Sequence, residues 1–423
     1  MRINNVIHFS TEDFGGAGSA ALRVHKTCQE YGFNSILFCK NKRTSEESIL
    51  AVRSILKNFY FRVLNKIDSK LNLFNDKYFF FEKNRNTLSD IKQIERHIPF
   101  HPNIIILHWI SGFVDLRVIK QLQEKYNCKV YWYLMDMAPM TGGCHYAWDC
   151  IGYTDGCFSC PAVGFVYENL PLKTLQYKKQ MIKNIGIEAI SGSTWLSKQL
   201  NNSMLFKDKE IHEIMLGINS EVFKPLNEDN ILNIKLKYNL PLDKKIIFFG
   251  ASSTTDERKG FGYLIKALKL LSKDHLIDNN SVIIVTAGKF ISREDFKNLT
   301  LPHKHIGYLN GNTELAEAYQ IATMFVSPSI EDSGPMMINE SIMCGTPVVS
   351  FKMGVAEDLV FNGTTGYIAE LKNVEDLANG IAIIINLNNK KYKKMQENCR
   401  EIGLRKCSTE VQVNKLISLM DDK

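Results

Sequence analysis

The 423-residue sequence contains no run of about 18 or more apolar residues, so no membrane-spanning helix is expected. Its N-terminus lacks a charged stretch followed by a long apolar one, so we see no secretory signal and expect a cytoplasmic protein. Fixed-period repeats and low-complexity segments are missing as well. Because hydrophobic residues make up 45% of the chain and charged residues 23%, we expect a folded protein and not a disordered one.

A strong excess of charge of one sign is also missing. The 52 Lys and Arg residues against 45 Asp and Glu residues give a formal net charge of +7. This mild excess suits an enzyme that handles phosphorylated ligands or touches an anionic membrane surface. A nucleic-acid-binding protein would need a denser basic patch, so we expect no nucleic-acid partner.

The order of apolar and turn segments predicts an α/β fold. The N-terminus has a β-branched run, a glycine-rich turn at 14–19, a helical pattern to about Glu30 and a second strand at 34–39. Such strand–helix–strand units build parallel sheets covered by helices. A second series begins near Ile231. A chain of this length is therefore expected to form two doubly wound, Rossmann-like domains that face each other across a cleft.

A polar, proline-containing stretch at 225–227 predicts the domain boundary. We expect an N-terminal domain of residues 1–225, with 405–423 packing back on it, and a C-terminal domain of residues 226–404. Within the first domain, residues 54–75 have the pattern of a basic amphipathic helix. This helix either packs on the domain beside the acceptor or lies on the inner face of the membrane.

Doubly wound sheets bind ligands at the carboxyl ends of their strands, so the loops there are the places to search. In the first loop, Gly16 and Gly18 would let the backbone approach an anion at a helix N-terminus. The spacing is not G-x-G-x-x-G, which disfavours a nicotinamide cofactor, and a plain tight turn explains the glycines equally well. In a second loop, Arg258 and Lys259 stand where a helix begins, an end that cations usually avoid. A bound diphosphate would explain them, and a solvated loop is the alternative.

A third loop, at 327–349, carries two carboxylates. Pro335 is favoured in a first helical turn, and the helix is expected to run to Gly345. Asp332 precedes this helix and Glu340 falls in its second turn, so both can face one cleft and accept hydrogen bonds from the hydroxyls of a sugar and a ribose. A helix cap with a solvated Glu is the alternative, and it explains Asp332 but not the whole string.

Four of the ten cysteines lie close together in the sequence. Two of them form a C-x-x-C pair, and a histidine, His145, stands next to the first of the four. The four are Cys144, Cys150, Cys157 and Cys160. Such a set can complete a tetrahedral, structural Zn²⁺ site. The first spacing is wider than in common zinc ribbons, so buried reduced thiols and disulfides are the alternatives.

Longer strings carry a family resemblance. The segment at 327–351, SPSIEDSGPMMINESIMCGTPVVSF, followed by GTTGYI at 363–368, resembles the donor-binding signature of glycosyltransferase family 4. That family consists of retaining enzymes of the GT-B fold, which has two Rossmann-like domains. Short strings at 217–219, 223–225 and 319–322 also resemble it. Within the family, the sequence looks most like bacterial capsule, exopolysaccharide or O-antigen transferases with a cysteine-rich loop.

The resemblance implies roles for individual residues. Asp332 would face the donor sugar, Glu340 the ribose, and Lys259 would neutralise the diphosphate. Tyr308 and Leu309 would line the base. The remaining residues implied in donor binding are Gly16, Gly18, Arg258, Glu331, Ser333, Gly334, Pro335 and Met336. The family needs no metal or other cofactor for catalysis, and its proposed mechanism is a front-face displacement in which a donor phosphate oxygen helps deprotonate the acceptor hydroxyl.

Three departures from the family pattern matter. Asp332, with Glu331 beside it, stands where Glu is usual. Ala251 stands where Arg is common, and Arg258 is the candidate substitute. Met135 stands where His is usual, so the acceptor-side catalytic role falls to one of three candidates near strand ends: His108, Asp136 and His145.

We therefore expect a hexosyltransferase-type glycosyltransferase. It would move a sugar, with retention, from a nucleotide-diphosphate sugar to a glycan or lipid-linked oligosaccharide acceptor in bacterial surface polysaccharide biosynthesis. A lipid-linked acceptor would be compatible with peripheral contact at the inner membrane face. Two alternatives stay open: a catalytically silent GT-B scaffold protein of polysaccharide assembly, which Met135 and Ala251 motivate, and a GT-B nucleotide-sugar epimerase.

Overall fold

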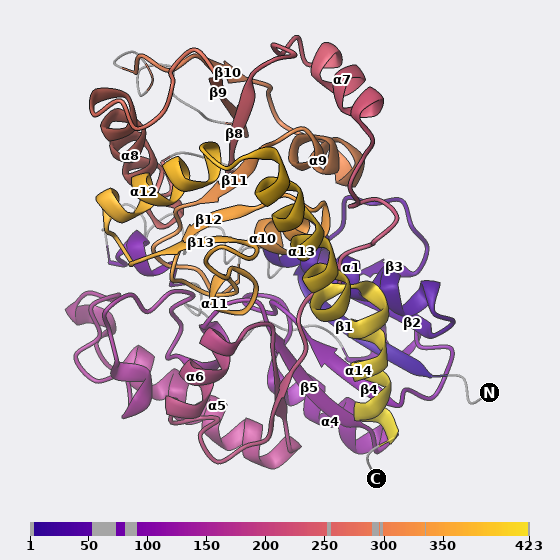
Figure 1. The fold of residues 1–423 in the computed structure, drawn as a ribbon. Coiled ribbons are helices and arrows are strands. Elements are labelled where there is room, and N and C mark those ends of the chain that lie inside the picture. The colour runs from indigo at the N-terminus through magenta and orange to yellow at the C-terminus, as the bar shows by residue number, and fades with distance from the viewer. Residues whose placement is uncertain are drawn as a thin grey trace. The chain divides into compact units, whose positions relative to one another are not determined.

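The computed structural model describes residues 4–52, 73–80, 91–251, 255–289, 296, 299–334 and 336–421. The chain divides into two compact units (Figure 1). The N-terminal unit comprises Met1–Met215 with Val413–Lys423, and the C-terminal unit comprises Leu216–Gln412. The cleft expected between the two units stays a prediction. Almost all of the basic amphipathic helix predicted at 54–75, and Pro335, lie outside the described residues.

The N-terminal unit is built on a parallel sheet with the strand order β3-β2-β1-β4-β5-β6-β7. In its central part, Val6 of β1 pairs with Ser35 on one side and Ile104 on the other. The strands are β1 (Asn5–Glu12), β2 (Asn34–Asn41), β3 (Ile49–Ala51), β4 (Ile104–Leu107), β5 (Lys129–Leu134), β6 (Glu188–Ser191) and β7 (Ile211–Glu213). The first six strands follow the Rossmann order, 3-2-1-4-5-6.

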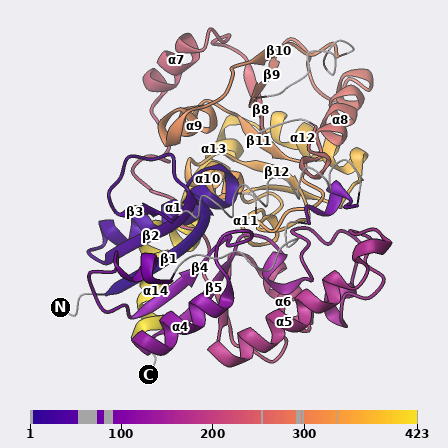
Figure 2. The ribbon, with the colours of Figure 1, turned by 180° about the vertical axis from the view of Figure 1, so that it is seen from behind.

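Helices flank this sheet. The longer ones are α1 (Gly15–Glu30), α4 (Leu116–Tyr126), α5 (Leu170–Ile185), α6 (Thr194–Asn202) and α14 (Thr409–Asp421), and the short ones are α3 (Ile91–Glu95), η1 (Asp76–Tyr78), η2 (Ala138–Met140), η3 (Gly152–Thr154) and η4 (Phe165–Tyr167). Helix α1 packs on β1 and β2, and α4 packs beside α5 (Figure 2).

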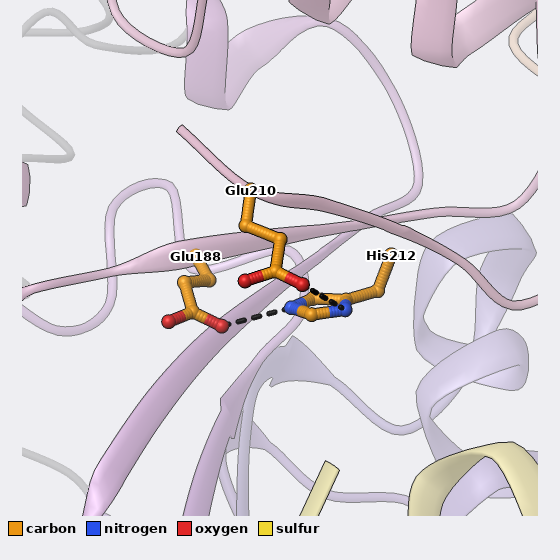
Figure 3. A group of neighbouring side chains, drawn as sticks. All are labelled: Glu188, Glu210 and His212. Carbon is orange, nitrogen blue, oxygen red and sulfur yellow. Dashed lines mark hydrogen bonds and ion pairs between the residues drawn. The ribbon is translucent and has the colours of Figure 1, made fainter. Parts of the chain in front are cut away.

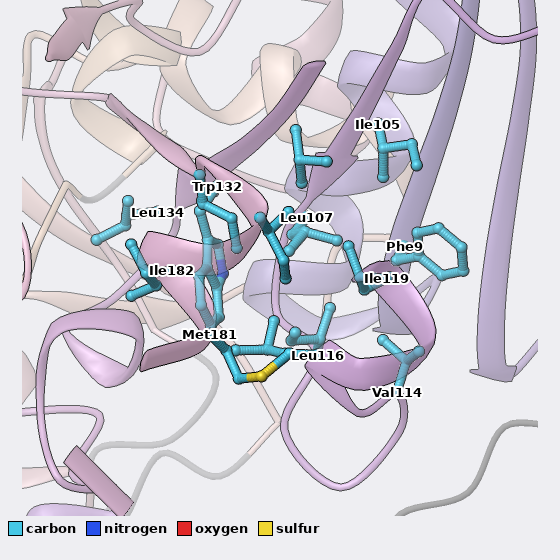
Figure 4. Packing of buried hydrophobic residues seen from close by; sticks show 14 of the residues in the cluster. Phe9, Ile105, Leu107, Val114, Leu116, Ile119, Trp132, Leu134, Met181 and Ile182 are labelled. Atoms are coloured by element: carbon cyan, nitrogen blue, oxygen red, sulfur yellow. The ribbon is translucent and has the colours of Figure 1, made fainter. Parts of the chain in front are cut away.

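The core of the N-terminal unit explains why its strands are apolar along their whole length. Figure 4 shows Phe9, Leu107 and Trp132 of neighbouring strands meeting Ile119 of α4 and Met181 of α5. All five side chains are buried. Because a parallel sheet is covered on both faces, its strands carry continuous apolar runs and not alternating ones. Burial of each such side chain contributes about 1.5–3 kcal/mol.

The C-terminal unit has a second parallel sheet, with the order β10-β9-β8-β11-β12-β13. Ile246 and Ile247 of β8 pair with Ile283 of β9 and Met324 of β11. The strands are β8 (Lys245–Gly250), β9 (Val282–Ala287), β10 (His303–His305), β11 (Met324–Ser327), β12 (Val348–Phe351) and β13 (Gly366–Ala369). This is again the Rossmann order, so the predicted fold of two doubly wound domains is confirmed.

The helices of the C-terminal unit pack on this sheet in groups. They are α7 (Glu228–Lys237), η5 (Glu257–Lys259), α8 (Phe261–Lys273), α9 (Gly311–Gln320), α10 (Met336–Met343), α11 (Ala356–Leu359), α12 (Val374–Ile385) and α13 (Asn389–Cys407). Helix α8 packs against α12, and α10 packs against α9 and α13 (Figure 1). Among the described residues, no helix is both long and apolar enough to cross a bilayer.

The division between the units falls after residue 215, earlier than the predicted boundary after 225. Contacts with the end of α13 and the start of α14 explain the difference: the backbone N–H of Ile218 donates to the carbonyl of Cys407 at 2.8 Å, and Gly217 lies against Gln412. The final helix belongs to the N-terminal unit from residue 413, where the hydroxyl of Tyr131 donates to the carbonyl of Leu419 at 3.1 Å.

In each sheet the strand order reverses at one point, between β1 and β4 in the N-terminal unit and between β8 and β11 in the C-terminal unit. Ligands of doubly wound sheets bind at the carboxyl ends of the strands beside such a reversal. The loops that follow β8 and β11, and those that follow β1, β4 and β5, are therefore the places where functional side chains are expected.

Candidate functional site

The loops after β8 and β11 are locked together by backbone contacts. Gly260 ends η5 and precedes α8, with a positive φ of 66°. A Cβ atom at this position would lie 1.7 Å from the carbonyl oxygen of Pro328, so only glycine fits. Next to it, the N–H of Ile330 donates to the carbonyl of Arg258 at 2.8 Å. These contacts fix the relative positions of the side chains that the two loops carry.

Lys259 and Asp332 form an ion pair at this point, with Nζ and Oδ2 2.5 Å apart. The carboxylate is buried, and 29% of the lysine side chain is exposed. Burial by itself would raise the pKa of Asp332, but the charge and hydrogen bond of Lys259, with the nearby charge of Arg258, hold that pKa below its usual value. The carboxyl is therefore ionised at neutral pH, and the ammonium beside it faces partly outward.

Arg258 has a different environment from Lys259. Its guanidinium is buried, and Nη2 lies 2.5 Å from Oδ2 of Asp256. Asp256 also accepts from the backbone N–H of Arg258, as the cap of η5. Of the two cations predicted to meet a diphosphate, Lys259 is thus the accessible one, and Arg258 acts on the site from inside the protein.

The second predicted carboxylate, Glu340, lies in α10 and is 1% exposed. Its Oε2 accepts a hydrogen bond from the hydroxyl of Tyr319 in α9, at 3.0 Å. A buried carboxylate needs such donors to offset the cost of leaving water. The sequence placed Glu340 correctly in the second turn of a helix, but it gave no sign that Tyr319 was its partner.

The remaining predicted donor residues surround Asp332. Glu331 and Ser333 are buried, Gly334 and Met336 are half-buried, and the N–H of Gly334 donates to Oδ1 of Asp332 at 3.3 Å. Gly354, which follows β12, was missed. Its φ is +58°, and a Cβ atom there would lie 2.6 Å from the backbone oxygen of Asp332. A third loop therefore packs directly on the Asp332 turn.

The predicted base-binding segment follows β10. Tyr308 is 51% exposed, and Lys289, which follows the neighbouring strand β9, places Nζ 4.8 Å from the centre of its ring. Leu309 is half-buried. An exposed aromatic ring beside a cation offers a stacking surface, which is a suitable contact for a planar base.

In the N-terminal unit, helix α1 begins at Gly15, so the glycines form its first turn and not a loop before it. Gly16 is exposed, and a Cβ atom on it would meet nothing within 4 Å. On Gly18 the same atom would lie 2.7 Å from the backbone oxygen of Glu12. Gly18 is therefore required for packing of the helix on the end of β1. Arg43 lies nearby, with its guanidinium 3.5 Å from the ring centre of Phe14.

His108 lies in the core of the N-terminal unit. It is stacked with His8 and Tyr133, and its Nε2 is 3.1 Å from Nδ1 of His8. Burial, helped by the charge of His25, lowers the pKa of His108 to about 3, so it is neutral at physiological pH. Within the described part of the chain its Nδ1 has no hydrogen-bond partner. This position favours the other two candidates for the acceptor side.

Those two candidates, Asp136 and His145, are paired. Oδ2 of Asp136 lies 2.7 Å from Nδ1 of His145, and its Oδ1 accepts from the N–H of Ala138 at 2.8 Å. The indole N–H of Trp109 approaches Nε2 of His145 at 3.4 Å. A carboxylate on Nδ1 fixes the imidazole ring and leaves Nε2 as the acceptor. Asp136 follows β5, and Trp109, which contacts His145, follows β4. The Asp136–His145 pair therefore lies at the carboxyl edge of the sheet.

A different side-chain group has metal-ligand spacing. Glu188, Glu210 and His212 have ligand atoms within 4.8 Å of one another, on the edge of the same sheet (Figure 3). His212 Nε2 is 2.8 Å from Oε2 of Glu188 and its Nδ1 is 3.8 Å from Oε1 of Glu210. Glu210 is exposed, and such pairs are common on surfaces without a metal. We interpret this group as a surface ion pair.

Comparison with known proteins gives a family match within the C-terminal unit. Residues 230–402, which include Lys259, Asp332 and Glu340, match the family model described as glycosyl transferases group 1. The match covers most of the C-terminal unit and none of the N-terminal one. The Lys259–Asp332 pair lies inside the matched region, in the loops at the strand-order reversal of the second sheet.

Individual relatives are distant. An uncharacterized glycosyltransferase of Haemophilus influenzae is 25% identical over 146 residues, 34% of this chain and 40% of that protein. The UDP-Gal:alpha-D-GlcNAc-diphosphoundecaprenol alpha-1,3-galactosyltransferase of Escherichia coli is 24% identical over 246 residues, 56% of this chain and 62% of that protein. The chain thus spans about half the length of the curated relatives that it matches first.

Solved structures extend the likeness of fold beyond the group 1 domain. HepE of Anabaena, in complex with UDP and glucose, superposes with a TM-score of 0.66 over 100% of both chains, at 12% identity. At that identity the match establishes the GT-B fold, with its two Rossmann-like domains, and no substrate.

Proposed function

We propose that this chain is a retaining glycosyltransferase that moves a hexose from a nucleotide-diphosphate sugar to a glycan or lipid-linked acceptor in bacterial surface polysaccharide biosynthesis. The Lys259–Asp332 ion pair, placed where a group 1 domain reverses its strand order, is the observation that supports this best. The ion pair offers two groups to a donor: the partly exposed ammonium of Lys259 for the diphosphate, and the buried carboxylate of Asp332 for the sugar hydroxyls.

The donor side is assigned to the C-terminal unit. Lys259 would bind the diphosphate, together with the free N–H groups at the start of α8, since a helix N-terminus favours an anion. Asp332 would then accept hydrogen bonds from the sugar, and Tyr308 would stack on the base. Negative charge that develops on the leaving diphosphate would be stabilised by these fixed groups, so catalysis would need no metal.

The acceptor side is assigned to the N-terminal unit. His145, held by Asp136, would take the place of the histidine that Met135 replaces. Its Nε2 would bind a hydroxyl of the reacting sugar or of the acceptor, and a donor phosphate oxygen would take the proton of the attacking hydroxyl. The new bond forms on the face that the diphosphate leaves, which retains the configuration at the anomeric carbon.

A panel of nucleotide sugars tests this function. One of them is expected to raise the melting temperature of the purified chain, because a ligand at about 100 times its Kd stabilises the folded state by about 2.7 kcal/mol. With that donor and lipid-linked acceptors, NMR should show a product that keeps the anomeric configuration of the donor. Binding without turnover would favour the scaffold, release of an isomerised sugar without acceptor would favour the epimerase, and an inverted product would refute retention.

Replacement of His145 by Gln is expected to lower kcat at least about tenfold and to change the donor Kd much less, because the loss of a group that positions a reacting hydroxyl acts mainly on the transition state. Asp136→Asn should have a smaller effect in the same direction, since it removes the charge that orients the ring. His97→Gln is the matched control, an exposed histidine of the same unit that contacts only the carbonyl of Gln93 among the bonds described. Equal kcat values for His145→Gln and the control would contradict the assignment.

A further inference from the structure

Lys178 of α5 is a lysine in the interior of the N-terminal unit, with only 4% of its surface exposed. It stands in the buried face of the helix, where its neighbours one turn away, Leu175 and Ile182, are apolar. An ammonium group is costly to bury unless hydrogen-bond acceptors replace the water that it loses. A methionine would fill the same space without that cost, so the acceptors of Lys178 indicate what this residue does.

The acceptors are two backbone carbonyls of the turn that follows β5. Nζ of Lys178 donates to the carbonyl of Ala138 at 2.7 Å and to that of Thr141 at 3.2 Å. Ala138 is the first residue of η2, and Thr141 caps its C-terminal end. Two hydrogen bonds from one ammonium therefore fix both ends of this short turn on α5.

The same two turn residues hold the Asp136–His145 pair from both sides. The N–H of Ala138 donates to Oδ1 of Asp136 at 2.8 Å, while Oδ2 of that carboxylate lies 2.7 Å from Nδ1 of His145. The hydroxyl of Thr141 donates to the carbonyl of Cys144, the residue before His145, at 2.6 Å. Each carbonyl that the buried ammonium binds thus belongs to a residue that contacts one partner of the pair or its chain neighbour.

The loop that carries His145 also carries the four clustered cysteines. Two of them are buried and two are half-buried: Cys144, Cys157, Cys150 and Cys160. Among the described residues no three of their sulfurs lie within 4.8 Å of one another, so the zinc site predicted from the sequence stays a prediction. In the part of the chain that the structure describes, His145 is instead held by the η2 turn and by the carbonyl of Tyr78, which accepts from its N–H at 3.1 Å.

We propose that Lys178 is a positioning residue for the acceptor side: it holds the η2 turn, and through this turn it keeps the carboxylate of Asp136 on Nδ1 of His145. The catalytic consequence rests on the role given to His145 in the proposed function. Without the ammonium, two buried carbonyls lose their donor, and the turn shifts to replace it. Asp136 shifts with the turn, and the imidazole then loses the hydrogen bond that selects its tautomer.

Lys178→Met is expected to lower kcat about tenfold and to change the donor Kd much less, because misplacement of a reacting group slows the chemical step. In a His145→Gln background the same substitution should lower kcat by less than about twofold, since residues that act through one another are not additive. A purely structural defect would lower kcat equally in both backgrounds. Lys235→Met is the matched control, because Lys235 is a buried lysine of the C-terminal unit whose Nζ donates to the carbonyls of Leu242 and Lys244, at 2.9 and 3.1 Å. It should leave kcat per folded chain unchanged.

The tautomer of His145 reports the position of the ring without turnover. In the wild type labelled with ¹⁵N-histidine, long-range ¹H–¹⁵N NMR at alkaline pH should show the proton on Nδ1. The reason is that Oδ2 of Asp136 accepts from this nitrogen, whereas the indole N–H of Trp109 approaches Nε2. The signal is assigned by its loss in His145→Gln. Lys178→Met should give a mixture of both tautomers, and Lys235→Met should keep the wild-type spectrum.

Because Lys178→Met risks unfolding, reductive methylation of the wild type, read by peptide mass spectrometry, is a further measurement. Lys178 is expected to react at least about tenfold more slowly than Lys179, its exposed neighbour on α5, since modification of a buried group needs local opening. Equal methylation rates of the two lysines would overturn the proposal.

Two results with the variants would also overturn it. One is a tautomer of His145 in Lys178→Met that equals that of the wild type, with kcat equal to that of Lys235→Met. The other is a loss of kcat in Lys178→Met that is the same with and without His145→Gln. Wild-type activity of His145→Gln would instead refute the acceptor-side role of His145, and the tautomer in Lys178→Met would still decide whether Lys178 holds the pair.

Discussion

Replacement of Lys259 by Ala is expected to lower kcat for sugar transfer by about 10²–10³-fold, the range observed when one fixed charge-stabilising donor is removed from an active site. Lys259 is the accessible cation of the donor loops. Since the leaving diphosphate gains charge in the transition state, loss of the ammonium should affect kcat more than the Kd of the intact donor. Steady-state kinetics and calorimetric titration with the donor found in the nucleotide-sugar panel measure the two separately.

Removal of Lys259 also changes its partner. Without that charge, burial would raise the pKa of Asp332, and part of the lost activity could come from a protonated carboxyl. If so, kcat of the variant would recover partly at higher pH, whereas loss of diphosphate binding alone would give no such recovery. The pH profile therefore separates the two effects.

Lys237→Ala is the matched control for this prediction. Lys237 lies in the same unit and also forms a short ion pair, 2.6 Å from Oε2 of Glu317 on α9. It is half exposed and far along the chain from the donor loops, so its removal should change stability by less than about 1 kcal/mol and leave kcat unaffected. If Lys259→Ala kept the activity of this control, the donor-site assignment would be wrong.

Much of the fold could be predicted because it depends on local pattern. The second strand, predicted at 34–39 as the apolar run after a helical pattern, is β2 of the structure at Asn34–Asn41. The start of α1 was less predictable. Glycines at 15–18 usually indicate a loop, but the close approach of the helix to β1 at Gly18 places them in the first helical turn.

Candidate site residues could be predicted where they lie together in one short sequence segment. Contacts between side chains from distant segments could not. Asp332 and Glu340 follow from one string, and Lys259 from another. The pairing of Glu340 with Tyr319, and of Asp136 with His145, depends on which loops lie side by side, which no local pattern encodes. The burial of His108 is of the same kind. Its position after a strand suggests a ligand loop, and only the stacking of His8 and Tyr133 on it shows that it belongs to the core.

Gly260 is packed so tightly that adding a single methyl group there should destabilise the protein strongly. Gly260→Ala is expected to lower the free energy of unfolding by at least about 4 kcal/mol, a value reached only by severe steric or burial defects. An alanine at φ 66° costs about 1–2 kcal/mol by itself. Its Cβ would in addition lie 1.7 Å from the oxygen of Pro328, so the loops after β8 and β11 must separate.

That separation should also abolish donor binding, because Lys259 and Asp332 come from the two loops that Gly260 joins. Gly262→Ala, two residues along in the first turn of α8, is the matched control for the stability measurement. Nothing lies within 4 Å of a Cβ atom there, so the change should be neutral or should stabilise by about 0.4–1 kcal/mol, the usual gain for such a replacement in a helix. Urea unfolding and calorimetric titration with the same nucleotide sugar measure both effects. If Gly260→Ala unfolded at the same urea concentration as Gly262→Ala, the two loops could not be packed as described, and the donor site built on them would have to be abandoned.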